Sequence, residues 1–240
     1  MNRKMLLPVL VAASIANSSA TAWDAGSWCF NPYVGMDAQI RHMDFKRGWG
    51  NNLFNHNLAQ GNLYVGTKFC PNVGVELGYE ASITRARTVT LTTGELLSAG
   101  APIPAILSPA VFRTRARLRG PHADLVGFYR FCDDYPLEVI GSIGVSLLKA
   151  TFERRVLKLH DMPLKSSVVR TFSRHKVVLR LMGGLQYMLG DNLGARATIG
   201  WVNTHKLVIP PSDGLPNPTF AKIKPKNSTI AGLGLFWIFN

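Results

Sequence analysis

The sequence is poor in acidic residues and in cysteine, and beyond its N-terminal segment it has no long apolar run. It has 14 aspartates and glutamates against 27 lysines and arginines, which gives a formal net charge of +13. This basic balance favours polyanionic partners. Because a transmembrane helix needs roughly 20 apolar residues, no part of the chain beyond that segment is expected to cross a membrane as a helix.

The N-terminal segment resembles an export signal. A charged start precedes an apolar run over 5–16, which is too short to span a bilayer, and Ala-Thr-Ala at 20–22 offers a small-x-small cleavage site. We expect a signal peptide over 1–22 and a single domain over 23–240. An uncleaved anchor is the alternative. Export makes nucleic acid an unexpected partner, and phosphorylated lipid or surface polysaccharide a better one.

The last stretch, 227–240, alternates with period two, which is the pattern of a strand. One register begins with the small Gly232 and Gly234. The other is apolar and ends on aromatics: Ala231, Leu233, Leu235, Trp237, Phe239. Small residues inward with apolar and aromatic residues outward are typical of a membrane barrel strand.

Seven further segments alternate in the same way, over 32–41, 62–69, 73–84, 123–131, 137–148, 176–189 and 194–202. Short turns at 70–72, 132–136 and 190–192 alternate with long connections over 43–60, 85–121, 153–174 and 206–226. The sequence therefore predicts an all-β fold, an eight-stranded antiparallel up-and-down transmembrane barrel with short periplasmic turns and long external loops. A soluble lipocalin-like barrel is the alternative, disfavoured because the polar registers are rich in glycine and serine.

The ends of the even-numbered strands carry outward aromatics, as an interfacial girdle requires: Phe69, Phe131, Tyr187, Phe239. The stretches VGVELGYE, LRLMGGLQYML and GLGLFWIF resemble the OmpA/OmpX/opacity-type family of small outer-membrane β-barrel proteins. The resemblance implies an outer membrane of Gram-negative type, with periplasmic termini. It also implies that Gly234, Trp237 and Phe239 form the signal read by the barrel-assembly machinery. No peptidoglycan-binding domain is expected.

The inward registers carry balanced charge, with five acids and five bases: Asp37, Glu76, Glu80, Asp124, Glu138, Arg41, Lys68, Arg130, Arg180, Arg196. Eight strands leave an interior barely wide enough for side chains, so these groups are expected to form a neutralised network that fills it. We therefore expect a polar plug. A narrow passive pore is the alternative.

Arginines alternate above the third and fourth predicted strands. Extending the outward register places Arg85, Arg87, Arg117 and Arg119 outside the barrel, just above the lipid. Because arginine binds phosphate in bidentate fashion, we predict a lipopolysaccharide-phosphate site there. A solvated charged loop is the alternative, since a bulge at Gly120-Pro121 would flip the register. The other long loops are also basic and could bind host polyanions, as an adhesin would.

A lipid A-modifying enzyme is a third class of function. The histidines at 56, 122, 160, 175 and 205 are expected in or beside the external loops, but none belongs to a recognisable nucleophile-and-base motif. We therefore expect a non-enzymatic protein without catalytic residues, cofactor or metal.

Three cysteines suit an oxidising compartment with one disulfide and one remaining thiol. Cys29, Cys70 and Cys132 flank predicted strand ends at the periplasmic rim. Because the first two strands are neighbours, Cys29–Cys70 is the favoured bridge, and Cys70–Cys132 is the alternative. None of the three has a cysteine or histidine at metal-ligand spacing.

Overall fold

The computed structural model describes residues 30–45, 53–92, 110–130, 136–159, 162–163, 169–205, 207 and 223–239. The strands are β1 (Asn31–Phe45), β2 (Asn57–Cys70), β3 (Val73–Ser82), β4 (Arg85–Leu91), β5 (Ala110–Arg130), β6 (Leu137–Leu159), β7 (Met162–Pro163), β8 (Val169–Met188), β9 (Leu193–Val202) and β10 (Pro225–Ile238). The predicted signal peptide lies outside the described residues.

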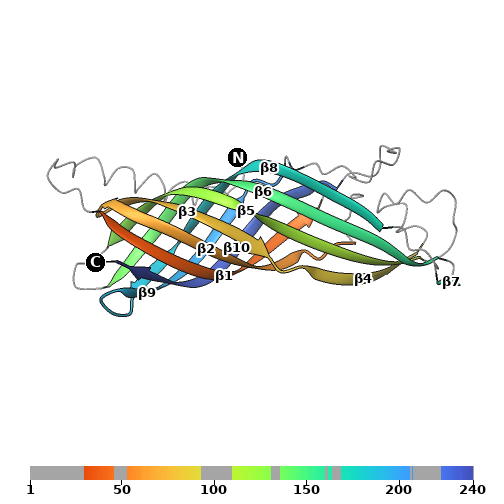
Figure 1. Cartoon of the computed structure of the whole chain (residues 1–240), viewed down its shortest axis with the longest axis horizontal. Helices are drawn as coiled ribbons and strands as arrows, with labels where there is room; N and C mark the ends of the chain where they lie inside the picture. Colours follow the sequence, from red (N-terminus) through yellow and green to blue (C-terminus); the bar gives the residue numbers. More distant parts are fainter. Residues whose placement is uncertain are drawn as a thin grey trace, which may run out of the picture.

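Eight of these strands close into an antiparallel barrel in the order β1–β2–β3–β5–β6–β8–β9–β10, and β10 pairs with β1 to complete the ring. The predicted fold class is confirmed. Pro71 and Asn72 alone connect β2 to β3, and residues 189–192 connect β8 to β9. This end of the barrel, here called the short-turn end, also carries the carboxyl end of β10 (Figure 1).

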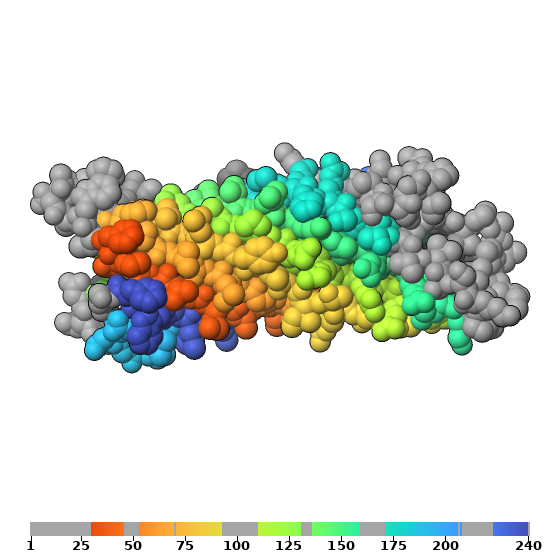
Figure 2. Space-filling view, in the orientation of Figure 1, coloured from red at the N-terminus to blue at the C-terminus, as the bar shows by residue number. Residues whose placement is uncertain are grey.

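The strands are inclined to the long axis, and β5, β6 and β8 extend beyond the other ring strands at the opposite, long-loop end (Figure 1). There β4 pairs with β5 beyond the end of β3, and β7 pairs with β6. In the space-filling view the described strands form one continuous elongated cylinder (Figure 2). In the described part of the chain, no helix is long and apolar enough to cross a membrane.

The outward face is apolar over the half of the barrel nearer the short turns. Met36, Leu63 and Leu233 are 61%, 63% and 70% exposed, and every ring strand contributes similar residues. Leaving apolar surface in water costs about 25 cal/mol per Å². A continuous band of this kind therefore faces hydrocarbon, as in transmembrane barrels.

The polarity of the two faces inverts toward the long-loop end, and β6 shows the change within four residues. Ser146 is buried inside the barrel and Leu147 faces outward, 46% exposed. One step further along, Leu148 is the buried residue and Lys149 faces outward. At Ser146 and Leu147, the inward residue is polar and the outward residue apolar, whereas at Leu148 and Lys149 the inward residue is apolar and the outward residue polar. This change marks the outer limit of the lipid-facing band.

Strand β5 inverts at the same level. His122 is buried inside and Leu125 is 52% exposed toward lipid. Further on, Leu118 and Phe112 are buried inside, and the arginines between and beside them face outward. Beyond the lipid band, the barrel therefore has the distribution of polarity found in a water-soluble protein.

Apolar side chains fill the interior at the long-loop end and form the cluster that we call the external core. Phe54 and Phe152 pack edge to face with ring centroids 5.0 Å apart, and Phe45 contacts both rings. The buried members are Met43, Phe45, Leu53, Phe54, Leu58, Leu91, Ala110, Phe112, Ala116, Leu118, Leu148, Ala150, Phe152, Phe172, Val178, Val202, Leu207, Ile223 and Ile230. This core closes the barrel on its external side.

Three strands are much longer than the sequence predicted. Residues 85–121 and 153–174 were expected as long connections, yet β5 already begins at Ala110, β6 continues to Leu159 and β8 begins at Val169. The prediction was wrong because these stretches are rich in outward charge. Their buried alternate residues form the external core, so the strands continue above the membrane.

Candidate functional site

The barrel interior at the level of the lipid band holds a connected set of charged side chains. Glu80, 1% exposed, accepts hydrogen bonds from Arg41 at 2.7 Å and from Arg180 at 3.1 Å. Arg180 also lies 3.4 Å from Asp124. The two guanidinium groups and two carboxylates neutralise one another, as buried charges require.

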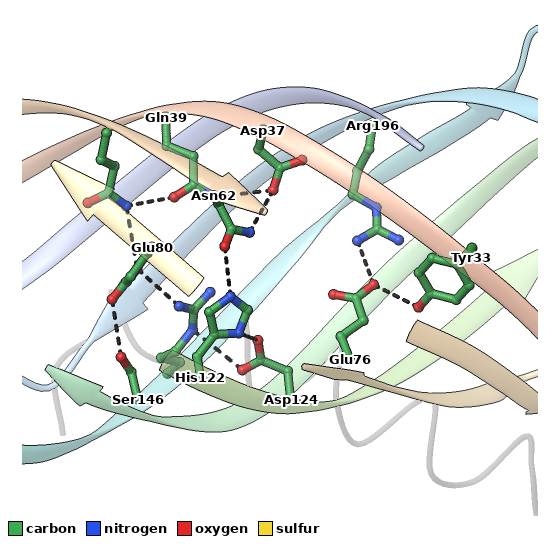
Figure 3. A network of polar contacts seen from close by, with 12 residues as sticks. Tyr33, Asp37, Gln39, Asn62, Glu76, Glu80, His122, Asp124, Ser146 and Arg196 are labelled. Carbon is green, nitrogen blue, oxygen red and sulfur yellow. Dashed lines mark hydrogen bonds and ion pairs between the residues drawn. The ribbon is translucent and has the colours of Figure 1, made fainter. Parts of the chain in front are cut away.

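His122 joins this set to a second group of polar side chains, as Figure 3 shows. Its Nδ1 lies 2.7 Å from Asp124 Oδ2, and its Nε2 lies 2.8 Å from the amide oxygen of Asn62. The amide nitrogen of Asn62 donates to Asp37 at 3.0 Å. The sequence analysis placed His122 beside the external loops, which was wrong, because β5 begins before it and continues the register of Asp124.

A further cluster surrounds Arg196, nearer the short turns. Its guanidinium group donates to Glu76 at 2.6 Å, and the hydroxyl of Tyr33 donates to the same carboxylate at 2.8 Å (Figure 3). The guanidinium carbon also lies 4.9 Å from the centre of the Tyr64 ring. These stacked groups fill the cross-section of the barrel.

The third cluster closes the short-turn end. Glu138 accepts hydrogen bonds from Lys68 at 2.8 Å, from Arg130 at 2.9 Å and from Gln186. Lys68 also stands 4.2 Å from the centre of the Phe128 ring. Nine of the ten charged residues predicted on the inward registers thus belong to the interior clusters. The tenth, Asp37, accepts a hydrogen bond from the side-chain amide of Asn62, which links it to the clusters.

Little open space remains between these groups. A cavity lined by Asp37, Asn62, Glu76, His122 and neighbouring side chains has a volume of about 30 Å³. That volume accommodates one or two water molecules. A hydrated ion or solute would require the charged clusters to separate, and the external core lies above them.

The arginines singled out in the sequence divide between two faces. Arg117 and Arg119 lie on the outward register of β5, between the buried Ala116, Leu118 and Gly120. The pairing of β5 with β6 continues without a shift through Gly120 and Pro121, so the bulge considered there is absent from these described strands.

Arg85 and Arg87 do not share that outward face, which corrects the prediction. Ala81 pairs with Arg119, but Arg85 pairs with Ala116, so four steps along β3 and β4 correspond to three along β5. The extra residue flips β4, because each step changes the face of a strand. Arg87 accordingly lies opposite the inward Thr114 and donates to the carbonyl oxygen of Phe54 at 3.2 Å.

The outward face of β5, β6 and β8 instead assembles a set that the sequence analysis missed. Arg119 lies directly opposite Lys149, which lies directly opposite His175. We call these three residues the basic row. A second row lies on the same face, two residues further from the membrane along each strand. It consists of Arg117, Thr151 and Ser173. The signal in the sequence is the alternation of charge on three strands, but only the register shows which residues become neighbours.

No protein-family model matches the chain, and no curated protein matches it by sequence. Several solved structures match in fold. A major outer membrane protein from Thermus thermophilus is 15% identical with a TM-score of 0.49, covering 86% of this chain and 99% of that chain. Neisserial surface protein A (NspA) is 13% identical with a TM-score of 0.48, covering 87% and 97%.

A third match is Ail, the attachment invasion locus protein of Yersinia pestis, solved in complex with the heparin analogue sucrose octasulfate. It is 13% identical with a TM-score of 0.46, covering 88% of this chain and 99% of that chain. The chain is similar to small outer-membrane β-barrel proteins. Its own closed ring and lipid-facing band agree with an outer-membrane location.

The residues of the predicted assembly signal lie on the last strand. Trp237 and Phe239 face outward, 46% and 52% exposed, and Gly234 lies opposite Asp37 on the inward face. Their recognition by assembly machinery stays a prediction. Cys29 and Cys132 lie outside the described residues, as does the side chain of Cys70, so both disulfide alternatives stay predictions as well.

Proposed function

We propose that this protein is a structural outer-membrane barrel whose outward face above the lipid binds the phosphates of lipopolysaccharide. The binding surface consists of the basic row, Arg119, Lys149 and His175, together with Arg117. Arg117 and Arg119 were predicted for this surface from the sequence, whereas Lys149 and His175 take the place of the predicted Arg85 and Arg87.

The position of the basic row is the observation that carries the proposal. In the register of β5, β6 and β8, the neighbouring row toward the membrane is Pro121, Leu147 and Val177. Leu147 and Val177 are 46% and 61% exposed and belong to the lipid-facing band. The basic row is therefore the first row above hydrocarbon, at the height of lipid headgroups.

The charges within the row also favour an anionic ligand. Arg119 and Lys149 lie directly opposite each other. Like charges in that arrangement repel. Within the described part of the chain, neither forms an ion pair with a carboxylate. A phosphate between them would remove the repulsion, and the arginine fork would bind it in bidentate fashion.

The second row adds hydrogen-bonding groups beside these cations. The hydroxyls of Thr151 and Ser173 lie 3.4 Å apart on the outward face, and Thr151 is directly opposite Arg117. Hydroxyls next to a guanidinium group suit phosphate or sugar oxygens. Further out, Arg115 lies 3.8 Å from Glu153, so part of the charge there is already neutralised.

The interior supports a structural role over a pore or an enzyme. The charged clusters and the external core occupy the barrel interior, and the cavity among the clusters has room for only one or two waters. His122 has an acidic partner, as a general base would. However, it is 5% exposed, and its described contacts are Asp124 and Asn62, with no serine or cysteine among them.

A pair of double variants tests the proposal. R117Q/R119Q removes two cations from the outward face, and R85Q/R87Q removes two from the other face of the same ribbon. Lipopolysaccharide that co-purifies with each protein in detergent is quantified per chain. We expect R117Q/R119Q to lose most of it and R85Q/R87Q to retain it. Equal retention in both variants would overturn the proposal, and so would equal loss. Repeating the assay with heparin separates lipid phosphate from sulfated polyanions.

A further inference from the structure

A second cluster of potential ligands lies on the opposite side of the barrel, at the rim formed by β1 and the start of β2. His42 and Asp44 are two residues apart on the outward face of β1, just beyond the lipid-facing Ile40. His56 returns to them from the connection before β2. The three side chains bring their ligand atoms within 4.8 Å of one another.

We propose that His42, Asp44 and His56 form a binding site for a divalent transition-metal ion, with zinc as the best fit. His42 Nε2 lies 3.4 Å from Asp44 Oδ1, and His56 Nδ1 lies 3.5 Å from the same oxygen. Tetrahedral zinc with bonds of about 2.0–2.1 Å separates its ligand atoms by about 3.4 Å. Octahedral coordination at similar bond lengths would bring them to about 3.0 Å.

The donor set agrees with that choice. Two imidazoles and one carboxylate suit zinc and its neighbours in the first transition row. Calcium and magnesium are bound mainly by oxygen, which this cluster supplies from one carboxylate only. Three protein ligands leave a fourth position for water or for a donor group of an external molecule.

Hydrogen bonds and ring contacts already orient both imidazoles. His42 Nδ1 lies 2.7 Å from Asn57 Oδ1, so a proton on Nδ1 leaves Nε2 free to face the metal. Metal-binding histidines usually have such a partner on the second nitrogen. The His56 ring packs edge to face against Phe45, which is buried in the external core.

The backbone holds the two segments together as well. The amide of Met43 donates to the carbonyl oxygen of His56 at 2.8 Å, and Asn57 pairs with His42 as β2 begins. The side chains of His42 and Asp44 are each 51% exposed and that of His56 is 27% exposed. The cluster is therefore held in place but open to ions from outside the cell.

The sequence analysis expected no metal. It considered metal spacing only around the cysteines, placed His56 in or beside an external loop and ended the first strand at Arg41. The strand in fact continues to Phe45. His42-x-Asp44 on one face of a strand was the signal that could have been recognised. The proposed site is independent of the basic row, which lies on β5, β6 and β8.

Zinc binding to the full-length protein, folded in detergent without a histidine tag, tests the proposal. A chromophoric chelator competes with the metal-free protein during titration with Zn²⁺. We expect one zinc ion per chain in the wild type, binding at least tenfold weaker in D44N and in H56Q, and unchanged binding in H205Q. His205 is an exposed imidazole just beyond the end of β9, and H205Q serves as the matched control. Heat-modifiable electrophoretic migration verifies that each variant is folded.

Wild-type binding no tighter than that of an H42Q/H56Q double variant would overturn the proposal. Loss of binding in H205Q equal to that in H56Q would overturn it as well. Cobalt provides a test that needs no variant, since tetrahedral Co²⁺ absorbs visible light far more strongly than octahedral Co²⁺. A strong visible spectrum from one equivalent of Co²⁺ on the wild type supports the site, and a weak one contradicts it.

Discussion

Gly35 of β1 lies directly opposite Tyr64 of β2, and the Tyr64 ring occupies the space that a side chain at position 35 would need. Two residues along, Tyr33 of β1 and Gly66 of β2 repeat this relationship, with the ring on the other strand. Both tyrosines are almost fully buried, Tyr33 at 3% and Tyr64 at 2% exposed. Glycine is thus what allows a narrow barrel to contain large aromatic side chains.

This packing predicts different outcomes for two glycine substitutions. G35A should destabilise the folded barrel by about 1–3 kcal/mol, because the added methyl group overlaps the Tyr64 ring. G61A should change stability by less than about 0.5 kcal/mol, since a methyl group at Gly61 meets no atom within 4 Å. Urea unfolding in lipid vesicles measures both. Equal stability of the two variants would contradict the described packing.

The buried ion pairs predict a strong effect at Arg180. R180L leaves the carboxylates of Glu80 and Asp124 without this partner and should cost about 3–5 kcal/mol. R130Q serves as the control. The Arg130 side chain is 44% exposed where it meets Glu138, so its loss should cost about 1 kcal/mol or less. Similar unfolding midpoints for the two variants would show that the interior network contributes little.

The filled interior predicts the absence of conductance. Wild-type protein inserted into planar bilayers should give no stable channel, since ions would have to pass both the charged clusters and the external core. F152A should lower stability by about 3–5 kcal/mol without opening a channel, because the polar clusters stay in place. A stable conductance from the wild type would favour the narrow-pore alternative.

The inversion of polarity predicts where the membrane ends. In a variant with all three cysteines replaced by serine, a new cysteine at Arg117 should react with a membrane-impermeant maleimide on intact cells. A new cysteine at Val145, which is 48% exposed toward lipid, should not react. Labelling at both positions would place the lipid boundary elsewhere, and labelling at neither would contradict the predicted orientation.

The sequence predicted the ring and its interior charges because period-two alternation determines the face of each residue within a strand. It predicted the long-loop end only in part. The alternation over 113–119 placed Arg117 and Arg119 on the outward face, but there the charged face is the exposed one, so stretches such as 153–159 resemble polar loops. The single extra residue between Ala81 and Arg85 was also invisible, because a change of register emerges only when a strand is paired with its neighbour.

The residues of the proposed metal site and of the basic row were not predicted as neighbours, for a related reason. Each combines residues from separate strands or connections, such as Arg119 with Lys149, or Asp44 with His56. The alternation within one strand says which side a residue faces. It does not say how far along the neighbouring strand its partner lies.

The inverted outer part of the barrel has a consequence for how the protein reaches its location. The outer ends of β5 and β6, opposite the turn that joins these strands, carry arginines and lysines to the far side of the membrane. A charged side chain at the bilayer centre costs about 2.5–3.5 kcal/mol on insertion scales. The four arginines in the outer part of β5, Arg113, Arg115, Arg117 and Arg119, would then add about 10–14 kcal/mol if they crossed bare hydrocarbon. Translocation of these strand ends is therefore a costly event in biogenesis, and we expect them to cross while shielded from lipid.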